Sequence, residues 1–238
     1  MNFYQEKCEP VLRKAAKMIE ETPHMQDIVK GVVPEEKMQF QIKQNYNYLM
    51  DYCRCWAVGF SKCKSYEEMM MFYPIVKSTM ESTIMTNRTY WAEQLHMSTE
   101  EMDSIIEAPG KRSYTAFQLM CAEQGDLAET MMALFPCNIM YRYFGEDLLG
   151  QCKLPTDNMF YQWLYFYTTE EYVAKCENEI AIVNTLCANK TEKEQAKLLE
   201  ILATSCNYEI LQWQHLYYEM ETWPLDDIFP AKFTTCKD

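Results

Sequence analysis

The fold is decided by one long stretch of the chain, which reads EEKMQFQIKQNYNYLMDYCRCWAVGFSK from Glu35 to Lys62. Pro34 comes immediately before this stretch, at a place where a helix tolerates proline. Apolar side chains recur in steps of three, four and seven residues, which is the spacing of one face of an α-helix. The stretch therefore predicts a long helix with one buried stripe, which consists of Met38, Ile42, Leu49, Tyr52 and Trp56.

The composition extends this prediction to the whole chain. The 238 residues include only 6 Gly and 9 Pro, whereas the good helix formers are abundant. A chain of this length can bury a sizeable core without a metal or disulfide scaffold. The sequence contains no internal repeat, linker or low-complexity tract. We therefore expect an all-α helical bundle that forms a single domain over residues 1–238.

Residues that cap helix N-termini, together with prolines and glycines, divide the rest of the chain into helices. We expect Pro109-Gly110 to end a short helix that Ser98 opens, and Asp126 to cap the second of two helices between 114 and 150. The other expected helices cover 4–21, a short segment ending at 31, 65–97, 159–167, a segment that starts after Thr169, and a segment from 191 to before 224.

The charge balance excludes several classes of partner. With 22 basic and 35 acidic residues, the chain has a net charge of -13, which repels phosphate backbones and anionic headgroups. No apolar run approaches the ~20 residues that span a bilayer. We therefore expect neither nucleic acid nor a membrane as a partner, and we expect a cytoplasmic protein.

The cysteines and histidines do not form a recognisable metal or disulfide pattern. The 11 cysteines are an odd number, spread from Cys8 to Cys236, and we interpret them as reduced thiols. The three histidines lie far apart in the sequence, at His24, His96 and His215. On these grounds we assign no metal and no cofactor.

Two of the predicted helices place polar or reactive groups on an apolar face. Asn45 interrupts the stripe of the helix that begins at Glu35, and Tyr48 follows on the same side. In the helix after Asp126, Cys137 lies one turn before Tyr141. A buried polar group left unpaired costs about 1 to 3 kcal/mol, so each position requires a partner or a ligand. Structural roles remain open, because cysteine is a common core residue and Asn45 could bond to a facing helix.

The last long helix carries a carboxyl group, Glu209, in the middle of an apolar stripe. An apolar setting raises the pKa of a carboxyl group towards the range that suits proton transfer. An ion pair with a lysine or arginine is the alternative explanation. The stripe around it consists of Leu198, Leu202, Cys206, Trp213, Leu216 and Met220.

These positions coincide with motifs of a known family. From about residue 5 to 223 the chain resembles the thiaminase II (TenA) family, which has the haem-oxygenase-like helical fold. The most specific match is Leu134-Phe135-Pro136-Cys137 together with Tyr141 and Gly145-Glu146. Other matching segments are Thr22-Pro23-His24-Met25, Gln44-Asn45-Tyr46-Asn47-Tyr48-Leu49, Trp163 with Tyr167-Thr168-Thr169-Glu170-Glu171-Tyr172, and Tyr208-Glu209 with Trp213.

The resemblance implies an aminopyrimidine aminohydrolase of thiamin salvage. Such an enzyme cleaves the bond between the exocyclic methylene of a 4-amino-2-methylpyrimidine and a nitrogen leaving group, either an amine or the thiazolium of thiamin. Cys137 would be the nucleophile, Glu209 the acid, and Tyr48 the group that favours the thiolate. Tyr141 and Tyr167 would bind the heterocycle. The family also implies a homotetramer.

Asn45 departs from the family pattern, because the family usually has an aspartate at this position. Asparagine is neutral and offers one acceptor and two donors. We therefore expect the variant Asn45→Asp to raise activity on the aminopyrimidine. The alternative is a pyrimidine-binding member with reduced or altered activity. An oxidase or metal enzyme of the same fold would need clustered ligands, which the scattered histidines do not supply.

Overall fold

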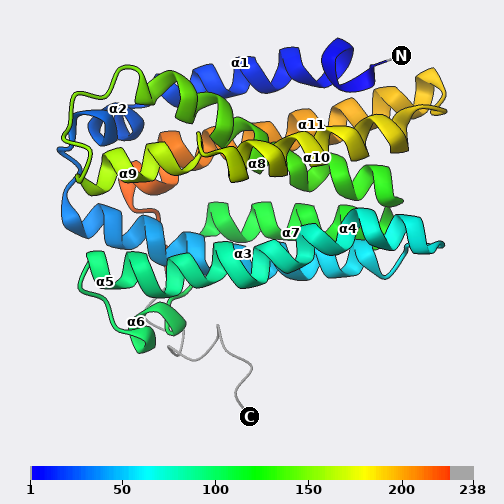
Figure 1. Ribbon diagram of the computed structural model, residues 1–238. Coiled ribbons are helices and arrows are strands. Elements are labelled where there is room, and N and C mark those ends of the chain that lie inside the picture. Colours follow the sequence, from blue (N-terminus) through cyan, green and yellow to red (C-terminus); the bar gives the residue numbers. More distant parts are fainter. Residues whose placement is uncertain (1, 226–238) are drawn as a thin grey trace.

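The computed structural model describes residues 2–225, which contain helices and no strand (Figure 1). The predicted all-α class is therefore confirmed for these residues. The helices, with π-helical turns marked η, are η1 (Tyr4–Cys8), α1 (Glu9–Glu20), α2 (Pro23–Lys30), α3 (Glu35–Phe60), α4 (Tyr66–Ser78), η2 (Thr79–Ile84), η3 (Asn87–Trp91), α5 (Ala92–Gln94), α6 (Thr99–Asp103), α7 (Pro109–Gln124), α8 (Leu127–Leu149), α9 (Met159–Phe166), α10 (Glu170–Cys187), α11 (Glu192–Leu211), η4 (Gln212–Leu216) and α12 (Tyr217–Glu219).

Side-chain caps mark the start of most of the α-helices. Ser98 and Glu101 form a complete capping box at the start of α6, and Thr191 and Glu194 form another at the start of α11. The carboxylate of Asp126 accepts the backbone N–H of Glu129 and so caps α8, as predicted. Each cap satisfies N–H groups that the first turn of a helix leaves without partners.

One predicted boundary is wrong. Pro109 does not end the helix that Ser98 opens; that helix, α6, already ends at Asp103, and Pro109 is the first residue of α7. Proline suits this first position because the missing N–H would have no helical partner there, and its fixed φ matches a helix. α7 therefore begins at Pro109 and not at residue 114, where the sequence placed its start.

π-Helical turns interrupt two of the long predicted helices, and η1 begins a third, the one expected over 4–21. In the segment 65–97, η2 and η3 follow α4, and in the final helix η4 follows α11 directly. A π turn adds a residue to the helical repeat, and such turns are frequent at functional sites. The side chains beyond each π turn therefore leave the face that a regular helix would give them.

The central element is α8, which packs against α1, α3, α7, α9, α10 and α11. It is buried over almost its whole length, as expected for a helix that is apolar on all sides. In Figure 1 one layer contains α1, α9, α10 and α11, and the other contains α3, α4 and α7. No helix within residues 2–225 is both long and apolar enough to cross a bilayer.

Candidate active site

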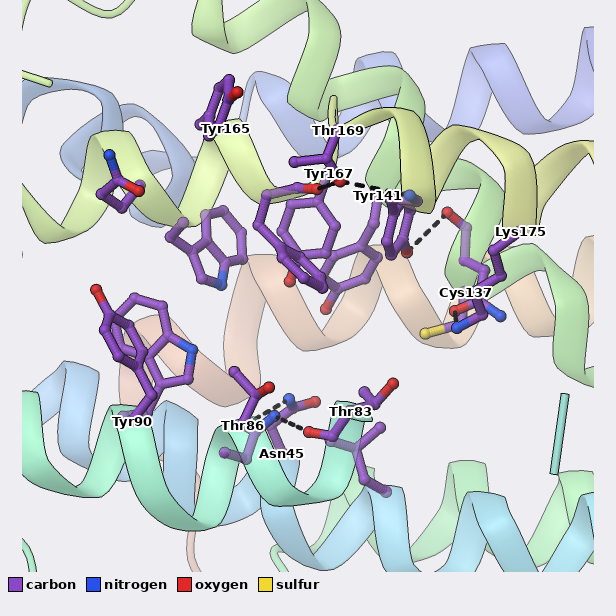
Figure 2. Close-up of a pocket in the computed structure, with 18 residues that line it drawn as sticks. Asn45, Thr83, Thr86, Tyr90, Cys137, Tyr141, Tyr165, Tyr167, Thr169 and Lys175 are labelled. Carbon is purple, nitrogen blue, oxygen red and sulfur yellow. Dashed lines mark hydrogen bonds between the residues drawn. The ribbon is translucent and has the colours of Figure 1, made fainter. Parts of the chain in front are cut away.

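A cavity of about 520 Å³ lies between the two layers, and four of the six predicted site residues line it. These four are Asn45 on α3, Cys137 and Tyr141 on α8, and Tyr167 at the end of α9. Figure 2 shows Cys137, Tyr141 and Tyr167 pointing into the cavity from one side, with Asn45 on the opposite side. The structure thus brings together residues that are up to 122 positions apart in the sequence.

Pro136 lies immediately before the thiol, and α8 continues through it as one helix. It lies inside the helix and has no N–H to donate to the preceding turn. Side chains from other helices bond to two carbonyls of this turn. The hydroxyl of Ser205 donates to the carbonyl of Ala133 over 2.8 Å, and that of Tyr52 donates to the carbonyl of Leu134 over 3.2 Å. Neighbouring helices thereby fix the backbone that carries Cys137.

Tyr48 and Glu209, the other two predicted residues, lie behind the cavity wall and contact Cys137. Each is only 1 % exposed. Burial and the neighbouring Glu209 carboxyl raise the pKa of the Cys137 thiol well above its usual value, whereas a hydrogen bond from Tyr48 lowers it. The amide of Gln118 donates to the Tyr48 hydroxyl over 3.0 Å, which leaves the hydroxyl proton free to point at the sulfur. Cys137 is therefore a neutral thiol before substrate binds.

The carboxyl group of Glu209 has no conventional hydrogen bond to either oxygen. Burial raises its pKa, while Lys111 and the nearby Cys137 thiol lower it. Burial makes the charged form of this carboxyl costly, and a carboxyl with a raised pKa is a good proton acceptor. Glu209 can therefore accept a proton from the neighbouring thiol.

Sequence reasoning missed Lys111, a lysine on α7 that is only 1 % exposed. Its ammonium donates to the Gln212 amide oxygen and, over 2.8 Å, to the Tyr217 hydroxyl. It also lies 4.2 Å from the ring centroid of Tyr48. These partners are all uncharged, and burial lowers the pKa of Lys111 to about 8. Lys111 is thus the cation that offsets Glu209, although no hydrogen bond joins them.

Asn45 has both of the roles considered from the sequence. Its amide nitrogen donates to the Asn87 side-chain oxygen over 3.2 Å, so Asn45 bonds to a facing helical segment. It also lines the cavity and is half-buried.

Aromatic rings form one wall of the cavity. The ring of Tyr141 lies 5.0 Å from that of Tyr167 and 6.2 Å from that of Trp163, measured between centroids. Both contacts are edge-to-face, an arrangement that fixes the orientation of aromatic rings. This wall provides flat apolar surfaces beside the thiol, as a planar heterocycle requires.

A second buried carboxyl group, also missed from the sequence, lies behind the residue that follows Cys137. The amide nitrogen of Asn138 donates to Glu179 over 2.7 Å and to Tyr52 over 3.1 Å. The ammonium of Lys175 donates to the amide oxygen of Asn138 over 3.2 Å. Burial raises the pKa of Glu179 to about 7, against the opposing effect of Lys175. Asn138 and Lys175 line the cavity.

Metal-ligating side chains do not gather within residues 2–225, where no group of three or more His, Cys, Asp or Glu could hold an ion. His24 is buried and bonds to Gln41 over 2.6 Å. The cysteines from Cys8 to Cys206 are free thiols, and Cys236 lies outside the described residues.

Comparison with known sequences identifies relatives along most of the chain. The profile of the TENA/THI-4/PQQC family matches residues 9–220. An aminopyrimidine aminohydrolase of Halalkalibacterium halodurans is 31% identical over 200 residues, which are 83% of this chain and 88% of that protein. An aminopyrimidine aminohydrolase of Bacillus subtilis is 27% identical over 201 residues, 84% of each chain.

Solved structures share the fold. A TenA homologue from P. horikoshii superposes with a TM-score of 0.78 at 22% identity, covering 88% of this chain and 95% of that one. A TenA homologue from Pyrococcus furiosus gives a TM-score of 0.75 at 15% identity, covering 89% and 96%. The predicted haem-oxygenase-like, all-α architecture is confirmed.

Proposed function

Because the chain belongs to the TENA/THI-4/PQQC family, we propose that it is an aminopyrimidine aminohydrolase of the thiaminase II type. Its substrate would be a 4-amino-2-methylpyrimidine whose exocyclic methylene carries an amine or the thiazolium of thiamin. The observation that carries the proposal is the contact of the Cys137 thiol with Glu209 and Tyr48 at the edge of an aromatic cavity. The relatives named as aminopyrimidine aminohydrolases support the same reaction.

The raised pKa of the thiol suggests how the first step proceeds. Glu209 takes the thiol proton while the sulfur of Cys137 adds to an electrophilic carbon of the pyrimidine ring. The protonated Glu209 then gives this proton to a ring nitrogen, so one carboxyl group acts first as base and then as acid. The hydrogen bond from Tyr48 stabilises negative charge on the sulfur as the thiol loses its proton.

The remaining steps restore the enzyme. The electron pair of the adduct expels the neutral thiazole, or the amine from its protonated form, from the exocyclic methylene. Water then adds to that carbon, and Glu209, which has given up its proton, accepts the proton that the water loses. The bond between sulfur and ring carbon then breaks, which returns the proton to Cys137 and releases the hydroxymethylpyrimidine. Tyr141 and Tyr167 hold the ring through edge and face contacts during these steps.

The direct test is to incubate the protein with thiamin and with the aminomethyl pyrimidine and to measure hydroxymethylpyrimidine. The variant Cys137→Ser should form no product above background, with an unchanged circular dichroism spectrum. Cys152→Ser is the matched control, because Cys152 is also half-buried but bonds to the Val29 carbonyl away from the cavity. Full activity in Cys137→Ser would refute the assignment of the nucleophile.

Asn45 supports a second candidate, a pyrimidine-binding protein with little or no turnover. Tight binding of the hydroxymethylpyrimidine without hydrolysis of either substrate would select this candidate. For either function we also propose a cytoplasmic homotetramer, as the family resemblance implies. Light scattering coupled to size exclusion tests the tetramer.

A further inference from the structure

The orientation of the Asn45 side chain follows from a short chain of hydrogen bonds that begins at the backbone. The side-chain amide of Asn87 bonds to the backbone carbonyl of Thr83 over 3.0 Å. A backbone carbonyl only accepts, so the group of Asn87 that faces Thr83 is its NH₂. The side-chain oxygen of Asn87 must then face the other way.

The side-chain amide of Asn45 contacts this oxygen of Asn87. Its side chain lies 3.2 Å from the Asn87 oxygen, and only an NH₂ group can donate there. The NH₂ of Asn45 is therefore held against Asn87, and its own carbonyl oxygen is turned away. Both hydrogen bonds are drawn beside Asn45 and Thr83 in Figure 2.

The carbonyl oxygen of Asn45 is available to a ligand. No donor within residues 2–225 bonds to it, and Asn45 lines the cavity. Asn87 is 6 % exposed, so water cannot easily replace its hydrogen bonds. A flip of the Asn45 amide would place two acceptors 3.2 Å apart in this buried setting.

We propose that Asn87 is a positioning residue that sets the specificity of the pocket, because it holds the neutral Asn45 amide with its acceptor towards the ligand. This inference rests on the proposed aminopyrimidine function. It predicts that the pocket binds a ring whose amino group faces Asn45. It excludes the corresponding oxo ring, because the ring oxygen and the side-chain oxygen of Asn45 would both be acceptors. Asn45 would thereby accept from the amino group without carrying a charge.

The test measures binding without turnover. Calorimetry compares the 4-amino-5-hydroxymethyl-2-methylpyrimidine with its 4-oxo analogue on the full chain. The wild type should bind the amino compound about ten- to a hundredfold more tightly, which is the usual effect of one unsatisfied buried polar group. Asn87→Leu removes the acceptor that holds Asn45, so the preference should fall to about threefold or less.

Two further variants keep the result interpretable. Asn87→Ala removes the same acceptor with a smaller side chain, and it replaces the leucine variant if that variant does not fold. Asn47→Ala is the matched control, because Asn47 is also a half-buried amide on α3, bonds to the carbonyl of Ile105 over 3.1 Å, and does not line the cavity. It should keep the wild-type preference.

The possible outcomes separate the two proposals. A preference that is lost in the Asn87 variants and kept in Asn47→Ala supports the role of Asn87. An unchanged preference in Asn87→Leu or Asn87→Ala overturns that role but leaves the pyrimidine function in place. If the wild type binds neither pyrimidine, the proposed function fails and this inference fails with it.

Discussion

Replacing Lys111 with methionine would test whether this chain maintains a charged group in its core. Lys111 is nearly inaccessible, and all of its direct partners are uncharged. Methionine has a similar length and no charge, so Lys111→Met removes the ammonium with little change in volume. Because Lys111 lowers the pKa of both Cys137 and Glu209, its loss should also move the pH profile of turnover to higher pH.

The size of the effect on stability follows from the pKa of Lys111. Burial lowers this pKa from 10.5 to about 8, so the unfolded chain holds the proton more tightly than the folded chain. The loss of folding stability from burying the protonated Lys111 is fully present below pH 8 and disappears as the pH rises towards 10.5. A shift of this size corresponds to about 3 kcal/mol, at about 1.4 kcal/mol per pH unit.

The assay is urea unfolding of wild type and Lys111→Met at several pH values from 7 to 9.5. The free energy of unfolding of the wild type should rise relative to the variant by about 2 kcal/mol between pH 8 and 9.5. Lys111→Arg gives a second reference, because arginine stays charged over this range. A difference between wild type and Lys111→Met that does not change with pH would refute the low pKa.

The two buried carboxyl groups give two further predictions. Glu209→Gln should lower kcat at least about a hundredfold, because it removes a proton acceptor and donor beside Cys137, and steady-state kinetics with a stable fold at pH 7 would check this. Glu179→Gln should remove a pH dependence of the free energy of unfolding. Burial raises the pKa of Glu179 to about 7, so this residue stabilises the wild type fully only below pH 4.5. In urea unfolding, the wild type should lose about 3 kcal/mol relative to the variant as the pH rises to 7.

The sequence predicts much of the fold because its local signals act within one helix. The capping boxes at Ser98 and Thr191 lie where the side chain and backbone within three residues decide the geometry. The positions of Asn45 and Cys137 could also be predicted, because both residues lie in regular helices that keep the spacing on which the prediction of buried faces rests. Both residues line the cavity.

Lys111 and Asn87 could not be predicted in the same way. Pro109 was interpreted as the end of a helix, so Lys111 fell in an expected loop, whereas α7 places it on a buried face with Tyr114 and Gln118. Asn87 begins η3 and is separated from the π turn η2 by two residues. A regular period of 3.6 residues therefore does not predict the direction of its side chain. Both misses therefore come from a helix whose start or repeat differs from the regular pattern.

The charge of an aspartate at position 45 by itself would favour the aminopyrimidine, but the orientation of Asn45 predicts the opposite effect for Asn45→Asp. An aspartate would set a carboxylate against the Asn87 oxygen, which cannot turn away without facing the Thr83 carbonyl. The loss of one hydrogen bond and the new repulsion should weaken pyrimidine binding about ten- to a hundredfold.

A double-mutant cycle separates this repulsion from a direct effect of the charge on the ligand. Asn87→Ala should weaken binding of the aminopyrimidine in the wild-type background, where it frees the amide of Asn45. In the Asn45→Asp background the same substitution should strengthen binding, because it removes the acceptor that opposes the carboxylate. If Asn87→Ala weakens binding equally in both backgrounds, Asn87 does not act through residue 45, and the charge at that position governs the affinity by itself.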